Sequence, residues 1–155
     1  MSQQQALDSL KASIGKEIHV SDWLTVTQER VNAFADATSD HQWIHVDVAR
    51  ARTESPYKGT IAHGYLTLSL YPALRGLVES GKPPFPGVKN VINYGINKLR
   101  FPSAVLVGSR VRARCTVLAA EEIPGGVQLT EQFTVEMEGG SKPACVAEVI
   151  MRLYF

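Results

Sequence analysis

The sequence contains few of the residues that mark several common classes of protein. It has only two cysteines, Cys115 and Cys145, which lie far apart in apolar surroundings. We therefore expect buried free thiols in a reducing compartment, and neither a disulfide framework nor a cysteine metal site. No apolar run is long enough to span a bilayer, and the N-terminal residues lack the apolar segment of a secretory signal. The expectation is a cytoplasmic protein with no membrane partner.

The chain also has almost no excess charge. Sixteen Lys and Arg residues oppose fifteen Asp and Glu residues, which leaves a formal net charge of +1. This balance gives no reason to expect nucleic acid as a partner, although a local basic patch could bind a phosphorylated ligand. With 155 residues, 45% of them hydrophobic and 20% charged, the chain has the size and composition of one globular domain.

The first part of the chain shows helical and strand-like spacing in turn. Weak helical spacing predicts an N-terminal helical extension within residues 1–15, and Lys16–Leu24 has the β-branched and aromatic residues of a first strand. Thr25 and Thr27 are candidate N-caps of an amphipathic helix, and Gln28 is placed to form a capping box with Thr25. This helix is expected to end just before Asp40, which would lie in a loop.

The most apolar helix-length run is Gly64–Ser80, which predicts one long helix buried on most faces and bent at Pro72. The residues after it alternate with period two. The signal is mixed over 91–101 and clear over 111–119, 127–137 and 145–155, with glycine-rich turns between the last three. The expected architecture is α+β: one antiparallel sheet around a buried central helix, with an outward sheet face on which a second copy could pack.

Three of the four histidines lie in one stretch that also contains Asp40. Asp40 and His45 are five residues apart across a loop, so their side chains can converge on one water molecule and move protons to and from it. The alternative is that Asp40 caps the loop and His45 is a hydrogen-bonded packing residue. A metal site would use His41 and His45 at helical spacing, with Asp40 and His63. Because Trp43–Val46 gives no helix signal, we do not expect a metal.

Gly64 follows His63 at the start of the predicted helix. A glycine there allows a ligand carbonyl to approach the backbone, and the free N–H groups and dipole of a helix start favour a developing oxyanion. The alternatives are that Gly64 serves only the turn and that His63 is a capping or packing residue.

Three segments together resemble a known family. Phe34–His45, with Ala51 six residues later, resembles the hydratase motif of the MaoC-like dehydratases, which are (R)-specific enoyl-CoA hydratases of the hot-dog fold. Gly59–Ser69 is similar to the start of the central helix of that fold, and Asn93–Phe101 to the strand that follows it. The resemblance extends from about residue 18 to the C-terminal residue.

The sequence departs from the usual motif at Gln42 and Trp43, where the family has Asn and Pro, and in this it resembles the nodulation-protein-N-like subgroup. The resemblance implies one hot-dog domain over residues 1–155 that hydrates trans-2-enoyl-CoA reversibly. Asp40 and His45 would activate the water and the Gly64 N–H would hold the thioester oxygen, with the division of roles between Asp40 and His45 left open.

The resemblance also implies an acyl-CoA thioester as substrate, no metal or redox cofactor, and a homodimer or higher homo-oligomer. Expected substrate contacts are His63, Tyr65, Trp43, Asn93 and Asn97. Lys98 and Arg100 are further candidates, although all the polar residues of this strand could be ordinary surface groups. Two other functions remain open, a hot-dog acyl-CoA thioesterase and a non-catalytic acyl-thioester-binding subunit.

Overall fold

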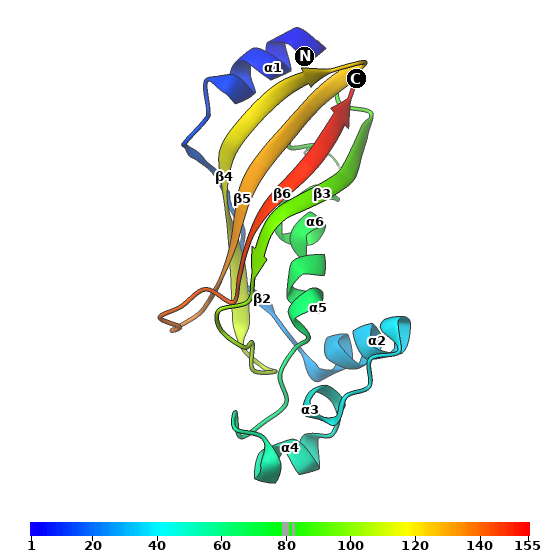
Figure 1. The fold of residues 1–155 in the computed structure, drawn as a ribbon, viewed down its shortest axis with the longest axis vertical. Helices are drawn as coiled ribbons and strands as arrows, with labels where there is room; N and C mark the ends of the chain where they lie inside the picture. The colour runs from blue at the N-terminus through cyan, green and yellow to red at the C-terminus, as the bar shows by residue number, and fades with distance from the viewer. Residues whose placement is uncertain (79–80, 82) are drawn as a thin grey trace.

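The computed structural model describes residues 1–78, 81 and 83–155 of the chain (Figure 1). Its helices are α1 (Gln3–Lys11), α2 (Gln28–Thr38), α3 (Trp43–Val46), α4 (Val48–Glu54), α5 (Gly64–Ser69) and α6 (Tyr71–Leu74). Its strands are β1 (Glu17–Val20), β2 (Leu24–Thr25), β3 (Asn90–Arg100), β4 (Arg110–Ile123), β5 (Gly126–Met137) and β6 (Cys145–Tyr154). The helical segments thus come mainly first and the long strands last, which is the predicted order.

The strands form one antiparallel sheet in the order β1-β4-β5-β6-β3, with β2 also paired to β4. The three consecutive strands β4, β5 and β6 form the predicted meander, and over most of their length every second side chain is buried. The sheet curves around α5 and α6, which lie against its concave face (Figure 1). The α+β class and the antiparallel sheet are therefore confirmed.

The prediction of one long buried helix over Gly64–Ser80 is wrong. The described part of this run forms two short helices separated at Leu70, and the helical structure ends at Leu74. Pro72 explains the interruption, because its ring nitrogen cannot donate to the carbonyl four residues earlier and the ring crowds that carbonyl. The run is also less buried than expected, since the side chains of Tyr65 and Val78 are 67% and 71% exposed. Residues 79 and 80 lie outside the described residues.

Helices α2, α3 and α4 form a lobe at the end of the sheet, beyond α5 (Figure 1). The N-cap of α2 is Thr27, whose hydroxyl accepts from the N–H of Arg30 at 3.2 Å, so the capping box predicted at Thr25 is wrong. The Gln28 side chain instead donates to the backbone carbonyl of His45 at 2.8 Å and accepts from the Thr60 hydroxyl at 2.6 Å. It thereby fixes the start of α2 to α3 and to the segment that leads into α5.

The segment between α4 and α5 is fixed to the loop before β4. The N–H of Ala62 donates to Val105 and that of Val107 donates to Thr60, at 2.8 and 2.9 Å. These bonds place the start of α5 beside both the helical lobe and the sheet, which is where the candidate site lies. Among the helices in the described part of the chain, none is long and apolar enough to cross a membrane.

Candidate active site

His45 lies on the one-turn helix α3 and is oriented by a backbone carbonyl. Its Nδ1 is 2.7 Å from the carbonyl oxygen of Ile61, and the residue is 8% exposed. Because a carbonyl only accepts, Nδ1 must carry the proton, which leaves Nε2 as an acceptor in the neutral ring. Burial lowers the pKa of His45 from its ordinary value of 6.5, despite the opposing effect of the bond to Ile61. His45 is therefore a neutral imidazole with one free nitrogen.

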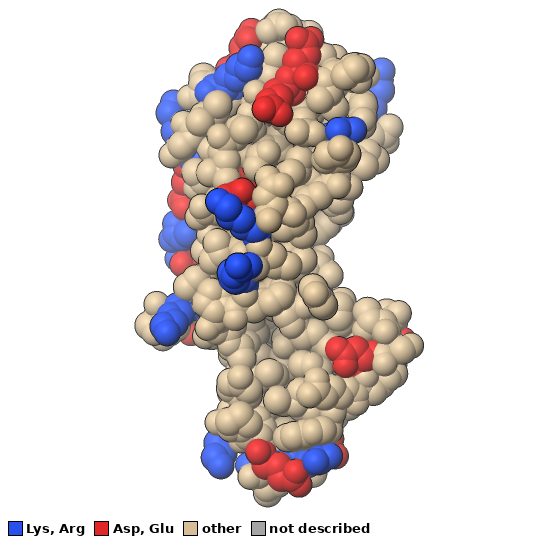
Figure 2. Space-filling view, in the orientation of Figure 1, with Lys and Arg blue, Asp and Glu red and all other residues tan. Residues whose placement is uncertain are grey.

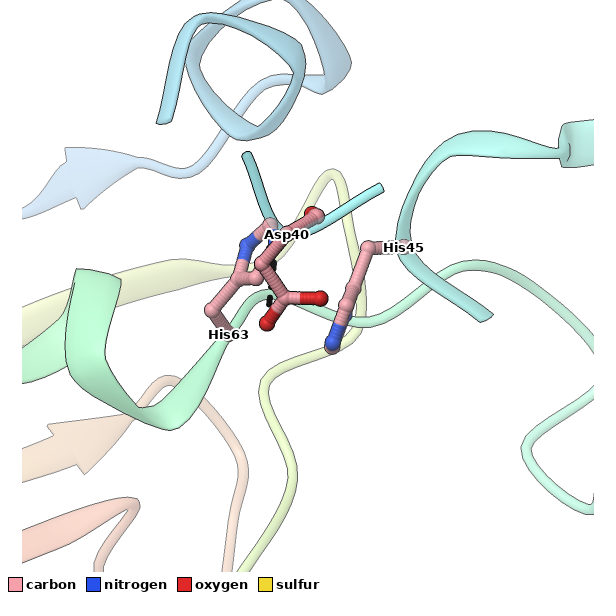
Figure 3. A group of neighbouring side chains, drawn as sticks. All are labelled: Asp40, His45 and His63. Carbon is pink, nitrogen blue, oxygen red and sulfur yellow. Dashed lines mark hydrogen bonds and ion pairs between the residues drawn. The ribbon is translucent and has the colours of Figure 1, made fainter. Parts of the chain in front are cut away.

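Asp40 follows the end of α2, where Ser39 adopts a left-handed conformation with φ of 60° and turns the chain towards α3. This confirms the prediction that Asp40 lies in a loop just past a helix. Its carboxylate is about half exposed, with a side-chain exposure of 53%. Figure 3 shows the carboxylate of Asp40 beside the ring of His45, and one side-chain atom from each of Asp40, His45 and His63 lies within 4.8 Å of the others. A water molecule bound here could contact both a carboxylate and an imidazole.

His63 is the residue just before α5, and it contacts both Asp40 and His45. Its Nε2 is 3.0 Å from the backbone oxygen of Asp40, and its ring stacks on His45 with centroids 3.8 Å apart and planes 26° from parallel. Phe34 of α2 contacts its ring, with centroids 5.0 Å apart. His63 is only 3% exposed.

Gly64 is the first residue of α5, and the N–H groups of a first helical turn have no acceptor within the helix. A β-carbon built on Gly64 would lie 2.9 Å from Cδ2 of Phe101, so any other residue here would require this ring to shift. No positive φ requires it at this position. A turn with positive φ, the alternative considered from the sequence, therefore does not explain this glycine, and the missing side chain leaves the backbone of the helix start accessible from the cavity.

A cavity of about 280 Å³ lies at part of this site, and neither Asp40 nor His63 is among its lining residues. His45 and Gly64 both line it, together with Tyr57, Thr67 and Phe101. The remaining lining residues are Ile61, Ala62, Pro102, Ser103, Ala104, Val105 and Ala144. A cavity with both polar and apolar lining, which includes an imidazole and a helix start, suits an acyl group whose polar end must be held and activated.

Several predicted substrate contacts do not line this cavity in the described structure. Trp43 lies under the guanidinium of Arg50, with its ring centroid 4.2 Å from Cζ, and Tyr65 contacts the edge of Phe101 from an exposed position. Asn93 and Asn97 are exposed on β3, the strand at the edge of the sheet. Their role in substrate binding stays a prediction.

The same holds for Lys98 and Arg100 on β3. Lys98 lies 3.4 Å from the carboxylate of Glu148, and Arg100 donates to the carbonyl of Leu99 at 2.7 Å. Both side chains are thus engaged with neighbouring groups of the sheet.

A metal site that includes His41 does not form. His41 is exposed, and its Nε2 bonds to Asp36 at 2.8 Å. The one-turn helix α3 does exist, contrary to expectation, but it begins after His41. Asp40, His45 and His63 are close enough to share an ion. However, Nδ1 of His45 and Nε2 of His63 already bond to backbone oxygens, so only one nitrogen of each ring remains, and that of His63 is buried.

The sequence analysis missed the groups that hold the site in place. The carbonyl of Ile61 is a backbone atom and has no sequence signal, and Gln28 was interpreted only as a capping residue. Phe101 carried a signal, because it ends the strand segment that resembles the family, but its contact with Gly64 could not be foreseen.

Comparison with known proteins agrees with this geometry. Residues 9–137 match the family described as the MaoC like domain. The chain is 52% identical to 3-hydroxyacyl-thioester dehydratase Z of Mycobacterium tuberculosis over 96% of its own length and 95% of that protein. It is 44% identical to Nodulation protein N of Rhizobium leguminosarum bv. viciae, over 97% of this chain and 92% of the relative.

A solved structure, the (R)-hydratase from A. caviae involved in PHA biosynthesis, superposes with a TM-score of 0.67 and is 28% identical, covering 88% of this chain and 97% of that one. The fold is thus that of the hot-dog hydratases and dehydratases. The chain belongs to the MaoC-like dehydratase family.

Proposed function

We propose that this protein is an (R)-specific enoyl-CoA hydratase, which converts trans-2-enoyl-CoA reversibly to (R)-3-hydroxyacyl-CoA by syn addition of water. One observation carries the proposal: the Nδ1 bond to Ile61 leaves Nε2 of His45 as a free acceptor in a ring that lies close to the carboxylate of Asp40 and that lines one cavity with Gly64. The name of the relative from Mycobacterium tuberculosis, 3-hydroxyacyl-thioester dehydratase Z, describes the reverse reaction on the same class of compound.

In the proposed mechanism, Asp40 and His45 hold one water molecule between them. The water oxygen bonds to the β-carbon as its proton passes to this pair, and the C=C electron pair shifts towards the thioester carbonyl. A proton from the pair then reaches the α-carbon on the same face, so the two protons balance. The Gly64 N–H, at a helix start, would donate to the enolate-like oxygen while it carries charge.

The thioester itself makes the β-carbon electrophilic, so the proposal includes no metal or redox cofactor, and coenzyme A enters only as part of the substrate. Preincubation with a chelator is expected to leave the rate unchanged. A rate that falls on chelation and returns with added metal would contradict this part of the proposal. A cytoplasmic location also remains part of the proposal.

We propose further that the protein forms a homodimer through β3. This edge strand exposes the apolar side chains of Ile92, Tyr94 and Ile96, which are 49%, 55% and 42% exposed. A groove of about 420 Å³ separates it from α5 and α6, and the surface over those helices is almost free of charged side chains (Figure 2). An edge strand with apolar side chains and unpaired backbone groups is suited to pairing with a second copy.

The reaction class can be tested with crotonyl-CoA. Loss of the enoyl-thioester absorbance without thiol release, with formation of the (R)-3-hydroxy product, is the expected result. Thiol release would indicate the alternative, a thioesterase that attacks the carbonyl carbon. If neither signal appears with short or long acyl chains, the protein would instead be a non-catalytic acyl-thioester-binding subunit.

A further inference from the structure

His63 is a buried histidine with one nitrogen that has no partner. The residue is 3% exposed, and its Nδ1 is the buried side-chain polar atom that lacks a hydrogen bond in the described structure. A buried polar atom without a partner costs free energy, and most such atoms in folded proteins are paired. An apolar ring of similar size would avoid this cost, so the packing alone does not explain a histidine here.

The other ring nitrogen supplies the explanation. Nε2 of His63 is 3.0 Å from the backbone carbonyl oxygen of Asp40, and that oxygen can only accept. Nε2 must therefore carry the proton and donate it. In the neutral ring Nδ1 then bears a lone pair that faces the interior. His63 and His45 thus hold opposite tautomers, each fixed by a backbone carbonyl.

The bond from His63 anchors a segment that has few other supports. Asp40 follows the left-handed Ser39, its side chain is 53% exposed, and its Oδ1 accepts only a long bond of 3.4 Å from the N–H of Gln42. The ring of His63 also stacks on His45 at a centroid distance of 3.8 Å. The side chain of His63 therefore contacts both members of the proposed catalytic pair, Asp40 and His45.

We propose that His63 is a positioning residue that does not contact the substrate. Its Nε2–H holds the main chain of Asp40 in place, and the face of its ring holds the plane of the His45 ring. The carboxylate of Asp40 and the free Nε2 of His45 can then bind the same water molecule. This replaces the sequence-based prediction that His63 contacts substrate. The inference rests on the proposed hydratase function.

The ring of His63 lies between the Asp40 loop and the rings of His45 and Phe34. The groups that face its ring are Asp40, with Oδ2 4.0 Å from Nε2, the stacked His45 and the apolar Phe34. A proton on Nδ1 would be buried without an acceptor, directly beside the ring that must take up the proton of the attacking water.

Three substitutions separate the hydrogen bond from the ring. The amide nitrogen of Gln reaches as far along the side chain as Nε2, whereas that of Asn reaches only as far as Nδ1, and Phe keeps the ring but has no donor. We expect His63→Gln to keep kcat within about tenfold of the wild type, and His63→Asn and His63→Phe to lose about a hundredfold through misplacement of the pair. KM for crotonyl-CoA should stay within about twofold in all three.

His41→Gln is the matched control, because His41 is exposed and its Nε2 contacts only Asp36 in the described structure. It should not change kcat. Thermal denaturation of each variant shows whether it is folded, and the comparison of Gln with Asn stands even if the Phe variant does not fold. Equal kcat for the Gln and Asn variants would overturn the positioning role, as would a raised KM with unchanged kcat.

A second readout does not depend on activity. In ¹⁵N-histidine NMR spectra, assigned with the His63→Gln variant, His63 should show the Nε2–H tautomer and His45 the Nδ1–H tautomer. A His63 whose neutral ring carries its proton on Nδ1 would overturn the inference even in an active enzyme. If both tautomers are as expected but crotonyl-CoA is not hydrated, the proposed function is wrong, while the hydrogen bond from His63 to the backbone of Asp40 is still supported.

Discussion

At the scale of single residues, the stacked imidazoles of His45 and His63 have different roles in the proposed site. His45 lines the cavity and keeps a free Nε2, while His63 bonds to the backbone oxygen of Asp40. The same two elements of chemistry, a carbonyl acceptor and a buried ring, fix both tautomers. The two rings differ in the surroundings of the second nitrogen. The ring of His45 lies near the carboxylate of Asp40, whereas Nδ1 of His63 is buried in the packed interior.

The first prediction at this scale concerns pH. Burial lowers the pKa of His45, so the neutral base persists below the ordinary value of 6.5. The acid limb of kcat/KM for hydration should therefore have its midpoint below 6.5. Because the unfolded chain binds this proton more readily than the folded one, the contribution of His45 to stability should also decline as pH falls below 6.5. A midpoint above that value in the rate profile would contradict this environment for His45.

The second concerns Gly64→Ala. The new β-carbon would lie 2.9 Å from the ring of Phe101, which is 39% exposed and can move. We expect little change in thermal stability but a fall of about tenfold or more in kcat/KM, because the helix start loses its approach to the thioester oxygen. The double variant with Phe101→Leu relieves the clash and should recover part of the loss. Wild-type kcat/KM in the single variant would count against an oxyanion role for Gly64.

At the scale of elements, the interrupted helix is held by a buried ion pair. Arg75, just after α6, donates to Glu131 of β5 at 2.8 to 3.1 Å, and the hydroxyl of Tyr71 donates to the same carboxylate at 3.0 Å. Arg75 and Glu131 are 3% and 0% exposed. These bonds tie α6 to the centre of the sheet after Pro72 has broken the helical pattern.

Arg75→Met is expected to destabilise the protein by about 3–5 kcal/mol, because it leaves the carboxylate of Glu131 buried without its cation. Urea denaturation measures this loss. The double variant Arg75→Met/Glu131→Leu removes both charges and should recover much of it, since an apolar pair of similar volume often replaces a buried ion pair without cost. A double variant with a lower free energy of unfolding than Arg75→Met would contradict this, because it would show that the ion pair stabilises the fold more than an apolar pair in its place.

These elements also show how far the sequence alone could lead. The alternation over β4 to β6 predicted the meander because a strand with one covered face has a strict period of two. Helix length was not predictable in the same way, since one proline outweighs a run of apolar residues. The one-turn helix α3 has too few residues for any periodicity to show.

For the site, the sequence predicted that Asp40 and His45 would converge, because both lie in one short segment between helices. It could not predict the carbonyls that fix His45 and His63, because every residue has a carbonyl and only the fold selects one. It named Trp43 and Tyr65 as substrate contacts, which stays a prediction, and it did not foresee that Tyr57 and Phe101 line the cavity beside His45.

At the scale of the whole molecule, the edge strand β3 leads to the prediction of a dimer. Ile96→Lys places a charge on this strand, where it opposes pairing with a second copy. Light scattering after gel filtration should show a dimer for the wild type and a shift towards monomer for the variant. Gln132→Lys, exposed on the central strand β5, is the control and should leave the mass unchanged. A monomeric wild type would contradict the proposed interface.

The most direct test of the central claim is the rate of crotonyl-CoA hydration by Asp40→Asn and His45→Ala beside the wild type. Circular dichroism should first show that both variants are folded. Loss of one member of an acid–base pair is expected to lower kcat by about 10²–10⁴-fold, with no thiol released by any of the three proteins. Hydration at the wild-type rate by either folded variant would contradict the assignment of this pair as the group that activates water.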